Sequence, residues 1–525
     1  MLKDELISTL LARKGLVTPD QINGFLHPLH PLEIAPARLD LSKSALTRAK
    51  KLIDRHLSAG HPVAVYGDYD VDGICATAIV WEALYKLSRR VFPHIPDRRA
   101  EGYGLSNAGI DHCLAKGAKL IIVLDSGIVA AREIKYCRDK GCDILIIDHH
   151  QPEEKLPRPT ALIHSTATSA AGLAWFFMRE FQKKPDLEAL SLVAISVVCD
   201  LVPLTGVNRS LAKFGLEQLN LTARPGLLAL FSQSGITPGQ IGPYEVGFII
   251  GPRINAMGRL EHAIDSLRLL CTTDLLRARK LAATLGETNR LRQDMTQKSS
   301  DHAISLFTGN NLPRLLIAAD PDYDEGIIGL VAARLVEKYF RPAIAVSVGR
   351  EKSKASARSV PGFHIIGFLR QFASLFESVG GHEMAAGFTF QTAKLDEVKN
   401  RLLKQAGRAI TPEILIKNQR IDAVVPVDVL DWDLCTALEQ FAPFGIGNPR
   451  PVFKSVKIPV TNFKRVGQTA KHLKFSAGGI EAIFFNAPDN IERKITATDL
   501  VYHLNPHVYQ GTASIQLVIK DLKSA

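Results

Sequence analysis

The sequence predicts a multidomain α/β protein: a doubly wound domain on a parallel sheet, a connecting helix, a second α/β domain and a small C-terminal β-barrel. Three observations support this prediction. Short apolar runs rich in Val and Ile alternate with amphipathic segments over residues 62–204, and a similar alternation returns over 313–408. Strand-like runs separated by turn residues follow from about residue 411. The 525 residues are also too many for a single hydrophobic core.

The N-terminal 45 residues predict a helical lead-in. Thr18 followed by Pro19 has the chemistry of a helix start, with Thr18 as the cap and Pro19 in the first turn. A proline-rich stretch over residues 27–36 indicates a linker or a wrapping arm, and a helix is expected over 42–57.

Three apolar runs, at residues 62–66, 119–124 and 143–147, fit central strands of a parallel sheet that is buried on both faces. Acidic residues follow each run, and a helix is expected over 74–87. Ligands bind outside the carboxyl ends of the strands in open parallel sheets, so we expect these acids to meet at one edge. The residues concerned are Asp68, Asp70 and Asp72 after the first run, Asp125 after the second, and Asp148, His149 and His150 after the third.

Asp200 is a further candidate for this edge. It interrupts the apolar run over residues 190–202, where a carboxylate is costly unless it is paired, hydrogen-bonded or metal-bound. A capping role at a helix end shortly before Pro203 is the alternative, and Asp200 considered alone favours that alternative.

The clustered acids predict a metal site. Carboxylates packed this closely repel one another, so a cation is expected to offset their charge, although an acidic surface turn is the alternative. Oxygen ligands with neutral imidazole and no thiolate suit Mn²⁺ or Mg²⁺ better than structural zinc. The set is large enough for two ions about 3.5–4 Å apart, with Asp125 as the expected bridge. Such a site supports hydrolysis of phosphate esters or anhydrides.

The overall composition points to a polyanionic partner. The formal net charge is +11. A basic excess together with an acidic cluster predicts that a polyanion is held near a metal. The net charge considered alone is equally well explained by the need of a protein to stay soluble. The seven cysteines include no Cys-x-x-Cys pair and predict reduced core residues. A charged N-terminus and the lack of a membrane-length apolar run predict a cytoplasmic protein without membrane contact.

The middle of the chain carries further candidates for binding phosphate. Arg253 is expected on a loop, and Ser356, Arg358 and His382 on loops of small residues. Small residues let a backbone approach an anion, Arg and Ser donate hydrogen bonds to it, and Arg253, Arg358 and His382 would neutralise charge that develops on a phosphate. The expected elements are loops at 251–260, 355–359 and 380–387, a mostly helical connector at 263–308, strands at 315–319 and 343–348, and a helix at 327–338.

The C-terminal part alternates apolar and polar residues in short runs, with frequent lysines and arginines. A barrel of OB type with basic and aromatic residues would suit single-stranded nucleic acid, and another small barrel that binds a different partner is the alternative. The expected strands lie at 420–426, 452–460, 472–476, 481–486, 499–504 and 513–521.

The motifs resemble those of a known family. Tyr66-Gly-Asp-Tyr-Asp-Val-Asp-Gly73, Asp125-Ser-Gly-Ile128 and Asp148-His-His150, in this order, are similar to the DHH phosphoesterase superfamily, and within it to the RecJ family of single-strand-specific exonucleases. Supporting segments are Arg98–Leu105, Cys199–Leu204, Gly251–Arg259, Glu325–Leu330, Ser356–Ser359, Gly380–His382 and Phe444–Pro449.

The resemblance implies a role for individual residues. Asp70, Asp72, Asp125, His149 and Asp200 match metal ligands, with Asp68 as a further candidate. His150 matches a catalytic residue that faces the scissile phosphate. Positions near the 5′ end of the DNA are matched by Arg98, Ser356 and Arg358. Residues that line the cleft are matched by Arg253 and His382. Two segments depart from the usual pattern. Tyr323-Asp324 replaces a Trp-His pair, and His164-Ser165 with a short loop stands where an Asn-Pro step and a longer loop are usual.

The resemblance also implies domains and an activity. The domains are a lead-in at 1–45, a DHH catalytic domain at 46–262, a connecting helix at 263–310, a DHH-associated domain at 311–408 and an OB fold at 409–525. The activity is 5′→3′ degradation of single-stranded DNA to 5′-mononucleotides with two Mn²⁺ or Mg²⁺ ions, in recombination and repair. A single-strand-binding protein and a helicase are further implied partners.

Two alternatives stay open. A DHH phosphodiesterase of short oligonucleotides would not need the basic C-terminal barrel, which argues against it. A non-catalytic replication scaffold would be expected to lose metal ligands, whereas this chain keeps them.

Overall fold

The computed structural model describes residues 3–524 except 103, 183, 310, 468–469, 489–490, 492–495 and 510–511. The chain divides into two compact units, Met1–Gly251 with Arg420–Ala525 and Pro252–Gln419. The first unit therefore unites the two ends of the chain. Within the described part, no helix is both long and apolar enough to cross a lipid bilayer.

A parallel sheet forms the centre of the N-terminal half of the first unit, with the strand order β2-β1-β3-β4-β5. Its strands are β1 (Val63–Tyr66), β2 (Val91–His94), β3 (Leu120–Leu124), β4 (Asp143–Asp148) and β5 (Ala161–His164). β1 and β3 are buried along their whole length, because a strand covered on both faces needs apolar residues at every position. The three strands expected from the sequence are confirmed, and β1, β3 and β4 end side by side.

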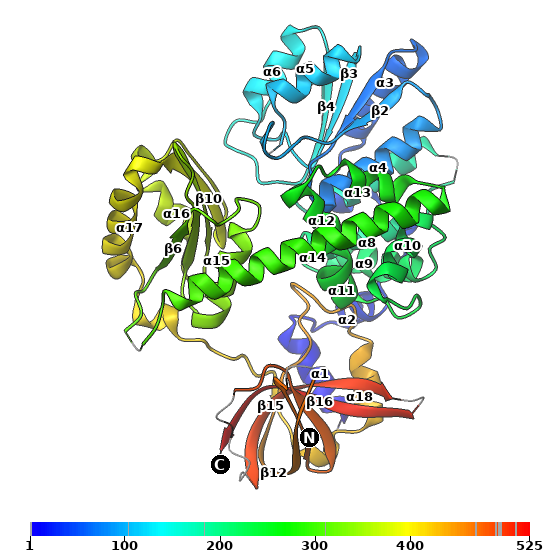
Figure 1. Cartoon of the computed structure of the whole chain (residues 1–525). Coiled ribbons are helices and arrows are strands. Elements are labelled where there is room, and N and C mark those ends of the chain that lie inside the picture. Colours follow the sequence, from blue (N-terminus) through cyan, green and yellow to red (C-terminus); the bar gives the residue numbers. More distant parts are fainter. Residues whose placement is uncertain are drawn as a thin grey trace. The chain divides into compact units, whose positions relative to one another are not determined.

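Helices cover both faces of this sheet, which confirms the doubly wound prediction (Figure 1). α5 (Asn107–Ala115) and α6 (Ala131–Asp139) share a core with one face. α4 (Val71–Tyr85), α7 (Ala170–Met178) and α8 (Leu190–Cys199) pack on the other side and are buried almost throughout, because their sequences are apolar all round. Further helices are α1 (Lys3–Arg13), α2 (Pro19–Leu26), α3 (Lys43–Ser58), α9 (Gly206–Asn220), α10 (Pro225–Ser234) and α11 (Pro243–Glu245), the last running into a π-helix at Val246–Ile250.

The C-terminal sheet closes into the expected barrel. Its strand order is β11-β12-β13-β14-β16-β15, and β12 also pairs with β15, so the five strands from β12 to β16 form a closed ring to which the short β11 is attached. The strands are β11 (Ala423–Val424), β12 (Phe453–Val466), β13 (His472–Ala477), β14 (Ile480–Phe484), β15 (Ala497–Tyr509) and β16 (Thr512–Ser524), with α18 (Trp432–Glu439) between the first two.

The N-terminal lead-in completes the core of this barrel. Leu6 and Leu10 of α1 are buried in one apolar cluster with Leu438 and Phe453. Thr18 caps α2 as expected, since its side chain accepts the N–H of Gln21. The two ends of the chain are therefore one folding unit, which the sequence pattern did not indicate.

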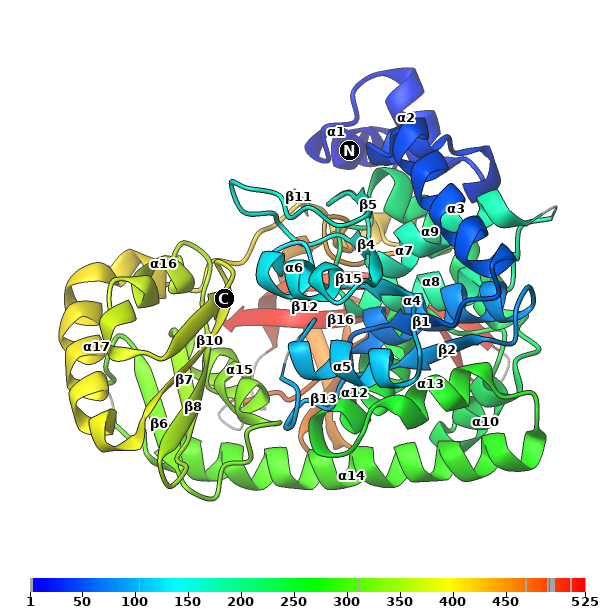
Figure 2. The same ribbon diagram turned by 90° about the horizontal axis from the view of Figure 1, so that it is seen from above.

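The second unit is built on a mixed sheet with the order β6-β7-β8-β10-β9, in which only β6 and β7 are parallel. α15 lies on one face of this sheet, and α16 and α17 lie on the other (Figure 2). Its strands are β6 (Leu316–Asp320), β7 (Ala343–Ser347), β8 (Lys352–Arg358), β9 (Ser378–Gly381) and β10 (Ala385–Gln391); its helices are α12 (Gly251–Leu260), α13 (Ile264–Cys271), α14 (Leu275–Ser305), α15 (Ile328–Tyr339), α16 (Ile365–Arg370) and α17 (Leu395–Ala409).

Three expected loops were wrong. Residues 251–260 form helix α12, which continues directly from the π-helix Val246–Ile250, so Pro252 lies within a helical segment and not in a loop. Residues 355–359 lie mostly in β8, and 380–387 are divided between β9 and β10. Small residues have weak strand propensity, and here pairing with β7 and β10 overrides it.

Candidate metal centre and anion-binding residues

The turn from β1 into α4 carries the first three aspartates. Helix α4 begins at Val71, earlier than expected, so Asp70 is its N-cap and accepts the Gly73 N–H at 3.1 Å, while Asp72 lies in the first helical turn. A Cβ on Gly73 would lie 2.6 Å from the backbone nitrogen of Asp68. Glycine is therefore required where this turn folds back on itself, and Asp68 is buried beneath it.

Asp72 is fixed by hydrogen bonds from two other helices. Its carboxylate accepts the backbone N–H groups of Ala170 and Ala171 at 2.7 and 2.8 Å and the hydroxyl of Ser196 at 2.6 Å. The first two donors belong to the N-terminus of α7, whose partial positive charge favours an ionised carboxylate. The orientation of Asp72 is thus set before any ligand binds.

Asp125 occupies the turn directly after β3. It adopts a left-handed backbone conformation, with φ of 61°, and only 2% of its surface is exposed. Its Oδ1 lies 3.2 Å from Nε2 of His149 but has no hydrogen-bond partner in the described part of the chain. Burial, together with the charges of Asp72 and Asp70, raises the pKa of Asp125 well above its usual value.

The residues after β4 have distinct surroundings. Asp148 Oδ1 accepts Nδ1–H of His150 at 2.8 Å and the His149 N–H at 2.7 Å, and Asp148 Oδ2 accepts the Ile128 N–H at 2.9 Å. Burial alone would lower the pKa of His150, but Asp148 outweighs it and raises that pKa to about 9. Burial lowers the pKa of His149, so its imidazole is neutral, as a metal ligand must be.

Asp200 is the C-cap of α8, as the capping alternative predicts, yet its side chain also faces the cluster. Its Oδ2 lies 3.5 Å from Nε2 of His149, the same distance that separates this nitrogen from Asp72 Oδ2. Burial and the charges of Asp72 and Asp70 raise the pKa of Asp200 to about 8.

The donor set fits divalent cations. Three overlapping groups have ligand atoms within 4.8 Å of one another: Asp68, Asp70 and Asp125; Asp125, His149 and His150; and Asp72, His149 and Asp200. Three buried atoms of this cluster lack a hydrogen-bond partner in the described residues, namely Asp68 Oδ1, Asp125 Oδ1 and His149 Nε2. A buried acceptor atom without a hydrogen bond costs free energy of folding. Coordination to a hard divalent cation would give all three atoms a partner.

Arg98 lies beside this cluster. Its guanidinium stands over the ring of Tyr69, 5.4 Å from the centroid. Burial and the charge of Asp70 raise the pKa of Asp68 well above its usual value, and the charge of Arg98 offsets a part of this rise. The segment is held by Glu101, which accepts the Asp97 N–H at 3.0 Å and pairs with His94 at 3.1 Å. Tyr103, part of the same motif, lies outside the described residues.

Ser356 and Arg358 come together in the second unit. They lie on one face of β8, and Nη1 of Arg358 donates to the Ser356 hydroxyl at 3.0 Å. A Cβ on Gly329, in the first turn of α15, would lie 2.8 Å from Nη2 of Arg358, so glycine makes room for the guanidinium. Arg358 is largely buried without a carboxylate partner among the described residues, which favours an anionic ligand.

The other two predicted residues of this unit are placed separately. His382 is exposed at the turn between β9 and β10, where its N–H donates to Ala385 O at 2.7 Å, and none of the described contacts joins it to Arg358. Arg253 lies on α12, where burial and the charge of Arg290 on α14 lower its pKa. Arg253 and Arg290 therefore give this unit a second basic site.

Sequence reasoning missed several supporting groups. Ser196 and the N-terminus of α7 hold Asp72, but an ordinary Ser and a small-residue helix start carry no signal of this role. His164, in the segment that departs from the family pattern, donates Nε2–H to His150 O at 2.8 Å. The sequence analysis gives Asp148 no individual role, although the Asp-His-His sequence makes a local carboxylate–imidazole bond foreseeable.

Comparisons with known proteins agree with this arrangement. Family matches are the DHH family N-terminal domain over residues 62–197, the DHHA1 domain over 312–410 and the RecJ OB domain over 421–521. The single-stranded-DNA-specific exonuclease RecJ of Bacillus subtilis (strain 168) is 31% identical over 534 residues, covering 98% of this chain and 67% of that protein.

Solved structures of RecJ from Thermus thermophilus are also similar. The complex with Mn²⁺ has a TM-score of 0.85 at 26% identity, covering 99% of this chain and 76% of that one. The complex with Mg²⁺ has a TM-score of 0.78 at 25% identity, with 99% and 74% covered. By its motifs, its domains and its similarity to these relatives, the chain belongs to the RecJ family of the DHH phosphoesterases.

Proposed function

We propose that the chain is a metal-dependent exonuclease that hydrolyses single-stranded DNA from the 5′ end and releases 5′-mononucleotides, in recombination and repair. The observation that carries this proposal is the buried cluster with three unpaired ligand atoms, at the carboxyl edge of the sheet. It is supported by RecJ relatives named as single-stranded-DNA-specific exonucleases and by RecJ structures with Mn²⁺ and Mg²⁺.

In this proposal, two Mn²⁺ or Mg²⁺ ions are held by Asp70, Asp72, Asp125, His149 and Asp200, with Asp68 as a further ligand and Asp125 as the bridge. Bound cations of this kind activate water and polarise the phosphate. Asp72 is oriented for this task by α7 and Ser196. His150 is half-buried, and because Asp148 raises its pKa to about 9 it would carry a proton and, as a donor, stabilise negative charge on the scissile phosphate.

Recognition of DNA is assigned to basic residues outside the cluster. Arg98 lies next to the acids and would hold the terminal phosphate near them. Ser356 and Arg358 form a paired donor site for the 5′ end, and Arg253 and His382 would line the substrate cleft. The barrel would supply a surface for single strands, within an OB domain proposed at 409–525; the match to the RecJ OB domain over residues 421–521 supports this.

A time course on single-stranded DNA labelled at either end tests the function. We expect early release of a labelled mononucleotide from the 5′-labelled strand and progressive shortening of the 3′-labelled strand, with Mn²⁺ or Mg²⁺ and not with chelator. Release from the 3′ end would overturn the polarity. Comparable turnover of dinucleotides and long strands would favour the short-substrate alternative, and no hydrolysis with either metal would favour the scaffold. Binding of a single-strand-binding protein and a helicase is proposed as a further property.

A further inference from the structure

The segment that carries Asp200 meets a loop from the C-terminal half of the same unit. The N–H of Leu204, four residues after Asp200, donates to Ile446 O at 2.7 Å. Two glycines of the loop Phe444–Pro449 touch the same segment. A Cβ on Gly447 would lie 2.9 Å from Cβ of Pro203, and a Cβ on Gly445 would lie 2.6 Å from Cδ1 of Leu204. The two segments are therefore in close contact, and a side chain at either glycine would require Pro203 or Leu204 to shift.

The loop is rigid because it is tied internally. Gly445 and Asn448 exchange backbone hydrogen bonds at 3.0 and 3.1 Å. The side chain of Asn448 is buried and donates to Phe441 O at 2.8 Å and Pro443 O at 2.9 Å, while it accepts from Lys14 Nζ at 2.7 Å. Asn448 thus uses both ends of its amide to fix one loop conformation.

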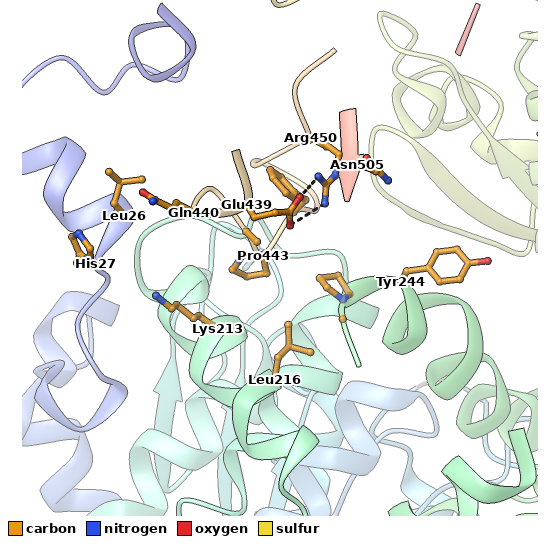
Figure 3. Close-up of a pocket in the computed structure, with 14 residues that line it drawn as sticks. Leu26, His27, Lys213, Leu216, Tyr244, Glu439, Gln440, Pro443, Arg450 and Asn505 are labelled. Carbon is orange, nitrogen blue, oxygen red and sulfur yellow. Dashed lines mark hydrogen bonds and ion pairs between the residues drawn. The ribbon is translucent and has the colours of Figure 1, made fainter. Parts of the chain in front are cut away.

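Two arginines contact the loop or the residues that lead into it. Arg209 of α9 is 1% exposed and donates to Phe441 O at 2.8 Å and Gln440 O at 3.1 Å. Arg450 lies 4.1 Å from the ring centroid of Phe444 and pairs with Glu439 at 2.5 Å, in a groove of about 930 Å³ that Figure 3 shows. The loop is therefore a fixed reference against which the Asp200 segment can be positioned.

The Asp200 segment itself has few other constraints. Leu201 adopts a left-handed backbone conformation with φ of 58° and is 65% exposed, so it contributes little packing. The described contacts of the Asp200 side chain are with the cluster, and its backbone N–H ends α8 by donating to Ser196 O at 2.8 Å. The Leu201 N–H donates to Val198 O at 3.4 Å, and the hydrogen bond from Leu204 to Ile446 then ties the segment to the loop.

We propose that the loop Phe444–Pro449 positions Asp200, so that the affinity of the catalytic metal site depends on a contact made by the C-terminal half of the unit. Gly445 and Gly447 are positioning residues, because only glycine permits the close approach to Pro203 and Leu204. This inference rests on the proposed function, in which Asp200 is a metal ligand. It gives the C-terminal half a role in metal binding in addition to its role in DNA binding.

Gly447→Ala tests the inference, with Gly479→Ala as the matched control. Both glycines have positive φ, of 73° and 83°, so alanine strains the backbone in each, but a Cβ on Gly479 meets nothing within 4 Å. Direct Mn²⁺ titration of the full chain by calorimetry should show affinity about tenfold weaker for Gly447→Ala and unchanged for Gly479→Ala. Binding of single-stranded DNA without metal should be the same for both variants. Equal Mn²⁺ affinity of the two variants would overturn the inference.

Two further variants keep the test decisive. If Gly447→Ala does not fold, Gly445→Ala takes its place: its Cβ would lie 2.6 Å from Cδ1 of the buried Leu204, so the Leu204 segment must move to accept it. Weaker Mn²⁺ binding supports the inference, and unchanged binding overturns it. Asp200→Asn separates this inference from the proposed function. If Asp200→Asn binds Mn²⁺ as tightly as the parent, Asp200 is not a metal ligand. If Mn²⁺ binding is weaker in Asp200→Asn but unchanged in the glycine variants, Asp200 is a ligand and only the positioning role of the loop is rejected.

Discussion

Asp148 and His150 form a carboxylate–imidazole pair in which Oδ1 of Asp148 accepts Nδ1–H of His150 at 2.8 Å. Asp148 is fully buried and also holds the backbone of His149 and Ile128, so it fixes the direction of both histidines. It takes no part in the three groups of potential metal ligands. Its role is to orient the two histidines, as is usual for a carboxylate that is hydrogen-bonded to a metal-binding or catalytic histidine.

Asp148→Asn should therefore lower exonuclease activity by roughly 10–100-fold without unfolding the protein, because the charge that holds His150 is lost. Steady-state hydrolysis of labelled single-stranded DNA measures this effect. Asp143→Asn is the control, since Asp143 stands at the opposite end of β4 and pairs with Arg55 and His56. Equal activity of both variants would contradict the role assigned to Asp148.

Asp125→Asn should abolish hydrolysis while binding of single-stranded DNA is retained. Asparagine keeps the size of the side chain and tolerates the left-handed backbone at this position, so only the charge changes.

Because the buried acids repel one another, the metal-free Asp125→Asn variant should melt at or above the melting temperature of the metal-free parent. Its melting temperature should not rise when Mn²⁺ is added. Full activity would reject the site. Asp139→Asn, at an exposed pair on α6, should behave as the parent.

Addition of Mn²⁺ to chelated protein should slow hydrogen exchange locally. Protection is expected at the ends of β1, β3 and β4 and at the end of α8, where the unpaired ligand atoms and Asp200 lie, and not in β13 of the barrel. Mass spectrometry of peptides from both states measures this pattern. Uniform protection, or the same protection in Asp125→Asn, would contradict a metal site at this edge.

Arg358→Lys should weaken recognition of a 5′-phosphate. Lysine keeps the charge but loses the fork that donates to Ser356 and, in the proposed function, to the terminal phosphate. We expect a KM about tenfold higher for 5′-phosphorylated DNA and little change for 5′-hydroxyl DNA. Arg350→Lys, at an exposed position near the start of β8, is the control. An equal effect on both substrates would exclude a role at the 5′ end.

Arg209→Ala should destabilise the first unit by about 3 kcal/mol, because three backbone carbonyls each lose a charged donor worth about 1 kcal/mol or more. These are Phe25 O at 2.6 Å, Phe441 O at 2.8 Å and Gln440 O at 3.1 Å. Urea unfolding followed by fluorescence measures the loss. The exposed Arg132→Ala on α6 should change stability by no more than about 0.5 kcal/mol. A similarly small effect of Arg209→Ala would show that Arg209 does not join the two halves.

The sequence by itself determined the strands of the first sheet and the approximate place of the acids. The uninterrupted apolar residues of β1 and β3 fit strands that are buried on both faces, and the residues after parallel strands of this kind meet at one edge. Local signals were sufficient there because side-chain burial and chain direction are set by a few adjacent residues. Thr18 with Pro19 likewise marked the start of α2.

Only the tertiary structure decided which distant groups complete these local features. The hydrogen bonds from Ala170 and Ser196 to Asp72 and from Leu204 to Ile446 join residues that share no sequence pattern. The strands at 355–359 and 380–387 likewise form because neighbouring strands pair with them, not because small residues favour strands. Long-range hydrogen bonds and close backbone contacts depend on the whole fold, so periodicity and residue type could locate the acids but not the groups that orient them.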